Sequence, residues 1–382
     1  MGLSFFVGYL FDGIRSNSGR GKHFSSVKTP QLLLLHFVTY SVLNLFTFLS
    51  SYDKIITYMF VNTFKLLSFL AFKLLIMKGS FCMPITEILE RNAREFGNDV
   101  ALVEVNPEIR ETRRVTWKEY ELIEPNPVCH YRREITWSVF NEKANRFANL
   151  LLSRGVKKGD KVGILLMNCL EWLPIYFGIL KTGALAVPLN FRYTPEEIKY
   201  CLDLAEVDIL VFGPEFIGRV EEIADEISKN RLLFYVGENC PSFAEHYDRL
   251  TANCASTTPY IELTDEDDAA IYFSSGTTGF PKAILHNHES LMHAARVEQN
   301  HHGQTKEDVF LCIPPLYHTG AKMHWFGSLI SGSKAVLLKG VKPEFILDTV
   351  SREKCTIVWL LVPWAQDILD AIDSGEVTLS KY

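Results

Sequence analysis

Apolar side chains recur at helical spacing in several stretches of the chain. Residues 83–97 carry them three and four positions apart, which predicts an amphipathic helix. Residues 138–154 repeat this spacing and predict a second helix. A third is expected to begin at Pro195, because Thr194 and Glu197 have the spacing of a capping box.

Short apolar runs alternate with these helical segments and predict strands. Continuous apolar runs are typical of strands buried on both faces, in parallel or mixed sheets covered by helices. The predicted fold class is therefore α/β. The runs occupy residues 161–167, 184–189, 208–212, 269–275, 309–313, 334–339 and 355–362, and a helix is expected over 170–181.

The first 82 residues differ from the rest, and the boundary predicts a separate segment 1–82 ahead of a domain 83–382. Residues 1–82 have a net charge of +6 and no Glu, which leaves −12 for the remainder of the chain. Residues 30–50 contain no charged side chain and are long enough to cross a bilayer. We favour the interpretation that residues 1–82 precede the true start of the protein. The alternative is a membrane anchor formed only by residues 30–77.

The composition limits which classes of function and which cellular compartment fit the chain. With 47% hydrophobic and 22% charged residues, the chain has the balance of a globular protein. Its acidic main part has no basic face of the kind that binds nucleic acid, so we exclude that partner. The eight cysteines are scattered without a C-x-x-C pair, which argues against a disulfide framework and favours a reducing, cytoplasmic location.

One loop carries the strongest chemical signal in the chain. Residues 272–282 read YFSSGTTGFPK and follow a predicted strand. Backbone N–H groups and hydroxyls of such a loop can surround phosphate oxygens, while Lys282 adds a positive charge. The spacing differs from the G-x-x-x-x-G-K-[ST] loop of GTPases. A plain hairpin turn would explain the Gly-Thr-Thr-Gly part alone.

The whole loop resembles the signature loop of the adenylate-forming (AMP-dependent synthetase/ligase) superfamily. That superfamily includes acyl- and aryl-coenzyme A synthetases, peptide-synthetase adenylation domains and luciferases. Residues 136–168, 178–190 and 315–320 resemble further segments of these enzymes, so the resemblance runs from Met83 to the end. It implies the large amino-terminal domain of that fold, with mixed sheets and packed helices and without the small carboxy-terminal domain.

The resemblance also implies an activity, that of an acyl-coenzyme A synthetase such as those of fatty acid metabolism. A carboxylate attacks the α-phosphorus of ATP, pyrophosphate leaves, and the thiol of coenzyme A then cuts the mixed anhydride. ATP, Mg²⁺ and coenzyme A are the implied cofactors, with a carboxylic acid as substrate.

Individual residues take roles from the same resemblance. Lys282 and His318 would be catalytic, with His318 near the reacting carboxylate. Thr278 would contribute to magnesium binding through the bound nucleotide. His318, Lys322, Met323 and Phe326 would border the acyl pocket. The ATP phosphates would be held by Ser274, Ser275, Gly276, Thr277, Thr278, Gly279 and Lys282.

The chain departs from the family pattern in its later part. It has no Tyr-Gly-x-Thr-Glu segment and no Gly-Arg-x-x-Asp hinge before Tyr382, so we expect a truncated large domain. An inactive nucleotide- or acyl-binding remnant, the adenylation module of another adenylate-forming enzyme, and a membrane-anchored scaffold remain as alternatives. Seven of the eleven histidines lie between His286 and His324, but no carboxylate or cysteine joins them at ligand spacing, so a histidine metal site is not expected.

Overall fold

The computed structural model describes residues 83–109, 112–117, 120–125, 131–274 and 280–382. All of them belong to one compact unit, Lys78–Tyr382. None of the helices in these ranges is long and apolar enough to cross a membrane. The anchor hypothesis for residues 30–77 lies outside the described residues, so the division at residue 82 stays a prediction.

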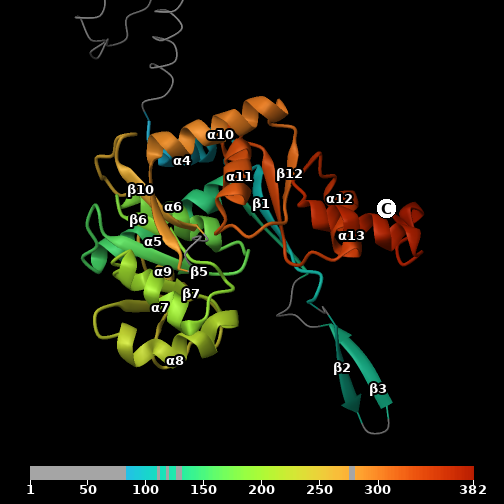
Figure 1. The fold of residues 1–382 in the computed structure, drawn as a ribbon, viewed down its shortest axis with the longest axis horizontal. Coiled ribbons are helices and arrows are strands. Elements are labelled where there is room, and N and C mark those ends of the chain that lie inside the picture. Colours follow the sequence, from blue (N-terminus) through green and yellow to red (C-terminus); the bar gives the residue numbers. More distant parts are fainter. Residues whose placement is uncertain (1–82, 110–111, 118–119, 126–130, 275–279) are drawn as a thin grey trace, which may run out of the picture. The chain divides into compact units, whose positions relative to one another are not determined.

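The larger of two main sheets has seven strands in the order β11-β10-β6-β5-β7-β8-β9 (Figure 1). Its neighbouring strands are parallel except for β10 and β11, which form an antiparallel pair. The strands are β5 (Lys161–Leu165), β6 (Leu185–Pro188), β7 (Ile209–Phe212), β8 (Leu232–Tyr235), β9 (Glu245–His246), β10 (Asp268–Ser274) and β11 (Lys282–Asn287).

The second sheet has five strands in the order β14-β12-β13-β1-β4, with β4 antiparallel to β1 and the other pairs parallel. A two-stranded antiparallel hairpin, β2 with β3, accompanies it. The strands are β1 (Val100–Val105), β2 (Thr112–Trp117), β3 (Tyr120–Pro125), β4 (Arg132–Thr136), β12 (Val309–Cys312), β13 (Lys334–Leu338) and β14 (Ile357–Val358).

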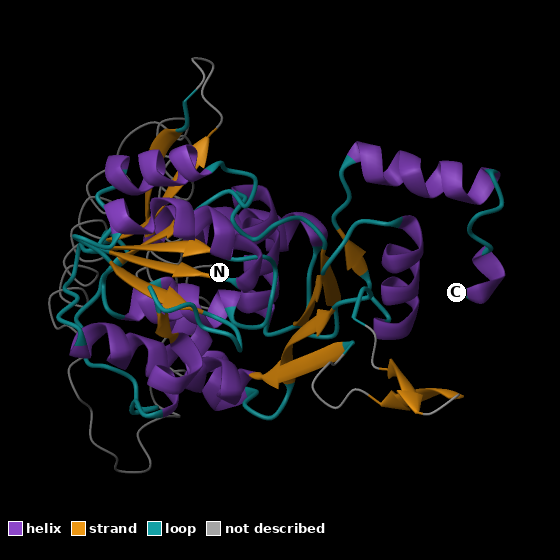
Figure 2. Ribbon diagram, turned by 90° about the horizontal axis from the view of Figure 1, so that it is seen from below, coloured by secondary structure: helices purple, strands orange, loops and turns teal. Residues whose placement is uncertain are grey.

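Helices cover the faces of these two sheets (Figures 1 and 2). The helices are α4 (Ile85–Glu95), α5 (Trp137–Ser153), α6 (Trp172–Lys181), α7 (Pro195–Leu204), α8 (Ile217–Ile227), α9 (Tyr247–Ala252), α10 (His288–His302), α11 (Thr319–Ser331), α12 (Pro343–Glu353) and α13 (Val362–Asp373). Short 3₁₀ turns lie at Pro214–Phe216 and Leu379–Lys381.

In β7 and β13, alternate residues enter different cores, as a strand buried on both faces requires. In β7, Ile209 and Val211 join the central core, which also contains α4, α5, α6, α10 and α11, whereas Leu210 joins the core under α7 and α8. In β13, Leu337 faces the same central core and Val336 faces the core beside α12. The central core thus lies between the two sheets.

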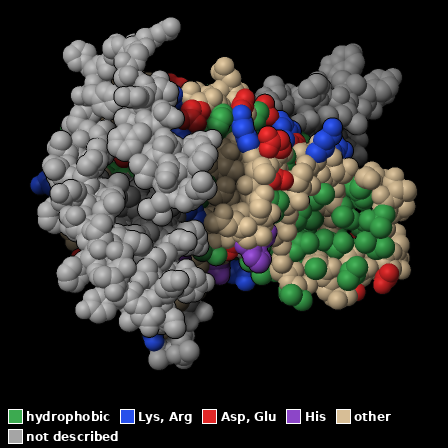
Figure 3. All heavy atoms as spheres, turned by 90° about the horizontal axis from the view of Figure 1, so that it is seen from above, with side chains coloured by type: hydrophobic (Ala, Val, Ile, Leu, Met, Phe, Trp, Pro, Cys, Tyr) green, Lys and Arg blue, Asp and Glu red, His purple; other side chains and the backbone are tan. Residues whose placement is uncertain are grey.

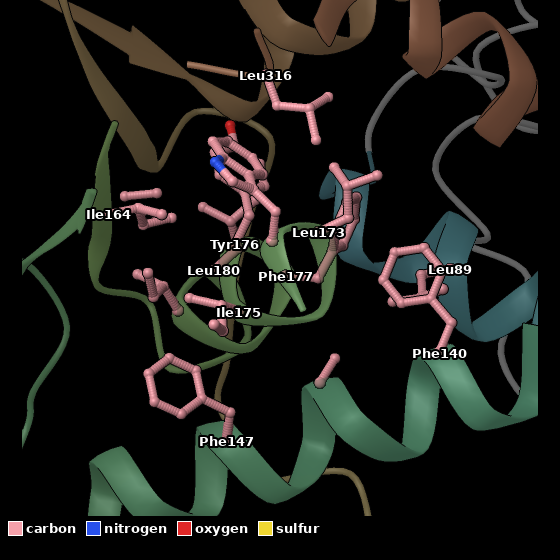
Figure 4. Packing of buried hydrophobic residues seen from close by; sticks show 14 of the residues in the cluster. Leu89, Phe140, Phe147, Ile164, Leu173, Ile175, Tyr176, Phe177, Leu180 and Leu316 are labelled. Carbon is pink, nitrogen blue, oxygen red and sulfur yellow. The ribbon is translucent and has the colours of Figure 1, made fainter. Parts of the chain in front are cut away.

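The close approach of α5 and α6 in the central core depends on a glycine. A Cβ at Gly178 would come within 2.9 Å of both the Ala144 carbonyl oxygen and the Phe147 ring. Figure 4 shows Phe140 and Phe147 on α5 beside the Tyr176–Phe177 segment of α6. Only a residue without a side chain lets the two backbones pack at this distance.

Most predicted elements are confirmed, including the helices over 83–97, 138–154 and 170–181. The capping box is present, because Thr194 Oγ1 accepts from the Glu197 N–H while the Glu197 carboxylate accepts from the Thr194 N–H. Each apolar run up to 334–339 contains a strand.

The strand predicted over 355–362 is much shorter than expected, since only Ile357–Val358 pair with β12 and Val362 already begins α13. Two local features account for this. Pro363 lies in the first turn of α13, where its missing N–H is tolerated, and Val362 is 83% exposed at an edge that no further strand covers within the described residues.

An apolar surface lies on the carboxy-terminal helices. Figure 3 shows hydrophobic side chains gathered over this part of the chain. The exposed large side chains here are Leu360, Leu361, Val362, Leu369, Leu379 and Tyr382. Isolated apolar residues are normal on a protein surface, but a group of this kind is typical of a contact face.

Candidate active site

Three loops leave the carboxyl ends of parallel strands and define the candidate site. Residues 166–171 follow β5, residues 275–279 follow β10, and residues 313–318 follow β12. In α/β sheets, ligands bind outside the carboxyl ends of the strands, where such loops gather. The middle loop lies outside the described residues.

Both ends of the predicted phosphate loop are held by an antiparallel strand pair. Ser274, the last residue of β10, is paired with Lys282, the first residue of β11. Ser274 is half-buried and Lys282 is exposed, so this lysine is free to meet a ligand. The ring of Phe280, just after the loop, lies 5.0 Å from that of Tyr200 on α7. The predicted ligands Ser275, Gly276, Thr277, Thr278 and Gly279 lie outside the described residues, and their roles stay predictions.

His318 lies on a tight turn that leads into α11. Its N–H donates to the Pro315 carbonyl at 3.0 Å, and the residue occupies the position just before the first helical residue, with extended backbone angles. Its side chain is exposed. The neighbouring Tyr317 ring packs edge-on against Phe191, with 5.3 Å between ring centroids. The turn is thus anchored by backbone and aromatic contacts while the imidazole stays accessible.

Asn168 links two of the three loops, and the sequence reasoning missed it. Its amide nitrogen donates to the Pro314 carbonyl at 3.0 Å, and its amide oxygen accepts from the Leu316 N–H at 2.9 Å. The residue is buried. A usable signal was present, since a polar residue directly after the buried strand run 161–167 falls at the carboxyl edge of the sheet.

Lys322, one turn into α11, lies in a box of aromatic rings. Its Nζ is 4.0 Å from the ring centroid of Tyr272, 4.4 Å from that of Tyr176 and 4.8 Å from that of Trp172. The side chain is fully buried, and Nζ has no hydrogen-bond partner within the described residues. Burial lowers the pKa of Lys322 well below its usual value. Because Tyr272 precedes Ser274 by two residues, this contact brings α11 against the end of β10.

Phe326 follows Lys322 by one helical turn and packs in the central core. Its ring centroid lies 6.3 Å from that of Tyr176 and 6.5 Å from that of Phe177, both on α6. Lys322 and Phe326 therefore share the α11 face that packs on α6. The side chain of Met323 lies outside the described residues, and the pocket-lining role of all three stays a prediction.

Near the aromatic box, buried polar groups pair with each other. The hydroxyls of Tyr176 and Tyr272 are 3.0 Å apart, and the His286 ring lies 5.3 Å from that of Tyr272. Burial lowers the pKa of His286, and the charge of Lys322 adds to the effect. Within the described residues, no group of three or more His, Cys, Asp or Glu side chains could hold a metal ion.

A buried carboxylate fixes the loop 166–171 from the side of the five-stranded sheet. Glu104 on β1 accepts from the Leu170 N–H at 2.8 Å and from Arg133 on β4 at 2.7 Å. Lys339 lies 3.7 Å from its other oxygen. These contacts give the almost fully buried Glu104 two cationic neighbours and a backbone donor, which its ionised form requires at such a site.

Sequence comparison connects this chain to known proteins. The profile of a family described as "AMP-binding enzyme" matches residues 89–380. A crotonobetaine/carnitine–CoA ligase from Salmonella paratyphi C (strain RKS4594) is 33% identical over 225 residues, which is 57% of this chain and 43% of the ligase. The chain therefore matches less than half the length of this curated relative.

Comparison with solved structures finds the same type of protein. The anthranilate CoA ligase AuaEII, in complex with anthranoyl-AMP, superposes with a TM-score of 0.67 and 26% identity, over 78% of this chain and 54% of that one. A long-chain-fatty-acid-CoA ligase from Archaeoglobus fulgidus gives a TM-score of 0.65 over 76% of this chain and 54% of its own. Its 18% identity supports likeness of fold alone.

Proposed function

Since this chain belongs to the AMP-binding enzyme family, we propose that it activates a carboxylic acid with ATP and transfers the acyl group to coenzyme A. Family membership confirms the resemblance predicted from the loop 272–282, and the structural neighbours confirm the α/β fold of the large domain. The observation that carries the proposal is the family match over residues 89–380, which includes the loop, together with the strand pair that frames it.

The first step would depend on positioning and charge rather than on a general base. A carboxylate is already ionised at neutral pH and can attack the α-phosphorus directly. Negative charge grows on the departing pyrophosphate, so cationic and N–H donors around it stabilise the transition state. We assign the β- and γ-phosphates to Lys282 and to Ser274, Ser275, Gly276, Thr277, Thr278 and Gly279.

Magnesium fits this proposal as an ion bound through the nucleotide. The described residues offer no cluster of acidic, cysteine or histidine side chains that would hold it without ATP. Magnesium commonly binds substrate phosphates with only one or two protein ligands. Thr278 would supply such a contact, and the bound ion would neutralise charge on the phosphate oxygens.

The carboxylate of the substrate would lie near His318. This imidazole is exposed at the start of α11, at the carboxyl end of β12, where a reacting carboxylate can approach it. Lys322, Met323 and Phe326 on the same helix would border the acyl pocket. The named relatives act on carnitine, crotonobetaine, anthranilate and long-chain fatty acids, which share a carboxylate but little else, so the proposal names the class of carboxylic acids only.

Pyrophosphate release that depends on a carboxylic acid tests the proposal. We expect Lys282→Ala to lower the turnover rate by about 10- to 1,000-fold, or about 1.4 to 4 kcal/mol, because the lysine acts on charge that develops in the transition state. Lys157→Ala is the matched control, since Lys157 is also exposed and is distant from the loop in sequence. An unchanged rate in folded Lys282→Ala would remove the assignment of this lysine.

The competing function is that of a catalytically inactive nucleotide-binding remnant. Calorimetry with ATP separates the two, because a remnant would bind nucleotide without releasing pyrophosphate for any acid in a broad panel. Acid-dependent release of pyrophosphate without formation of an acyl-coenzyme A thioester would instead indicate another member of the adenylate-forming class.

A further inference from the structure

We infer that Asn168 is a positioning residue that holds the turn carrying His318 in place for the reaction. The inference rests on the proposed role of His318 at the reacting carboxylate. Asn168 itself is buried behind the turn and acts through backbone groups.

The side-chain amide of Asn168 is paired on both sides with one short segment. It donates to the Pro314 carbonyl and accepts from the Leu316 N–H, at 3.0 and 2.9 Å. These partners lie 146 and 148 residues away in the sequence, and both bonds are buried. An amide can satisfy a backbone acceptor and a backbone donor at once, whereas an ionised carboxylate can only accept.

The two partner groups determine where the turn lies. Leu316 is inside the turn that is closed by the His318 N–H and the Pro315 carbonyl at 3.0 Å. Pro314 and Pro315 have no N–H of their own, so the Leu316 N–H is the first backbone donor that can anchor this segment. Fixing Pro314 and Leu316 therefore fixes the start of the turn that ends at His318.

Asn168 can act as an anchor because its own loop is held independently. The Leu170 N–H is bound at 2.8 Å by Glu104, which Arg133 and Lys339 hold in the five-stranded sheet. Because Glu104 holds this segment in place, residues 168–170 do not move with the turn 315–318 if that turn is displaced. The position of His318 is thus tied to β1 through residues 168–170.

Asn145 provides a matched comparison on a different part of the chain. It is also buried, and its amide donates to the Ser256 carbonyl at 2.8 Å and to Thr258 Oγ1 at 3.3 Å. Both substitutions remove a buried amide, but Asn145→Ala leaves one backbone carbonyl and one hydroxyl without a partner, in part-buried surroundings away from the turn. Only Asn168 holds the segment that leads to His318.

Hydrogen exchange on the full chain tests the anchoring directly. Asn168→Ala should speed exchange of the amides at Leu316 and His318 by at least about tenfold, because their hydrogen-bonded turn loses its buried partner. Asn145→Ala should leave these amides unchanged and affect residues 252–258 instead. Unchanged exchange at Leu316 in Asn168→Ala would overturn the inference.

Steady-state kinetics tests positioning as distinct from stability. With acid-dependent pyrophosphate release as the assay, Asn168→Ala should lower kcat/KM for the acid by roughly tenfold or more while KM for ATP stays within about twofold. Equal losses for acid and ATP, matching those of Asn145→Ala, would show a merely structural role. If the wild-type chain releases no pyrophosphate with any acid, the proposed function fails, and hydrogen exchange alone still decides whether Asn168 holds the turn.

A conservative variant gives a third readout. In Asn168→Asp, the ionised carboxylate still accepts from the Leu316 N–H but faces the Pro314 carbonyl without a proton, whereas the protonated acid can donate to it. Relative to wild type at the same pH, exchange at Leu316 and His318 should therefore be slower at pH 5.5 than at pH 8. The opposite pH dependence would contradict the assigned hydrogen bonds.

Discussion

Replacing Lys322 by methionine should make the protein more stable. The buried amine has no hydrogen-bond partner within the described residues, and leaving such a group unpaired costs about 1–3 kcal/mol. The surrounding rings of Trp172, Tyr176 and Tyr272 recover part of this, since a cation over aromatic faces gains about 0.5–2 kcal/mol. Methionine has similar length and fills the same space without the amine. We expect Lys322→Met to gain about 1 kcal/mol at pH 7.

The gain should depend on pH in a defined direction. Burial lowers the pKa of Lys322 below its ordinary value of 10.5, so the unfolded chain binds this proton more readily than the folded one. The destabilisation that Lys322 causes at neutral pH therefore decreases as the pH rises towards 10.5. The difference between Lys322→Met and wild type should therefore be larger at pH 7 than at pH 10.

Urea unfolding followed by circular dichroism measures both effects, with the free energy taken from the linear extrapolation. Lys181→Met is the control, because Lys181 is also buried but pairs with Glu90 at 2.5 Å. Its removal leaves Glu90 without its cation and should destabilise the protein. A Lys322→Met variant less stable than wild type, or a difference that does not change with pH, would refute the reasoning.

Two further predictions concern packing and acid stability. Gly178→Ala should cost about 1–3 kcal/mol, because its Cβ would meet Ala144 and Phe147 at 2.9 Å. Gly218→Ala on α8, with nothing within 4 Å, should instead stabilise by up to about 1 kcal/mol; equal effects in urea unfolding would contradict the α5–α6 contact. Burial lowers the pKa of His288 from 6.5 to about 4, so stability should be complete above pH 6.5 and fall by about 3 kcal/mol towards pH 4. The pH slope should be smaller in His288→Gln, and an equal slope would exclude this histidine as the cause.

The local features of this protein could be predicted from the sequence because their physical causes lie within a few residues. The Thr194–Glu197 capping box is one such feature, since both partners lie within one helical turn. Buried strands such as β5 and β7 were visible as apolar runs, because strands covered on both faces need apolar side chains in succession. The loop 272–282 was visible as a contiguous motif.

The tertiary structure decided every feature that depends on partners far apart in the chain. Asn168 became part of the candidate site through backbone groups almost 150 residues away, and Lys322 through rings on α6 and β10. The apolar run 355–362 gave only a two-residue strand, because its place at a sheet edge left most of it unpaired. Sequence patterns report which side chains prefer burial. Which groups meet in the buried interior follows only from how the two sheets and their helices pack.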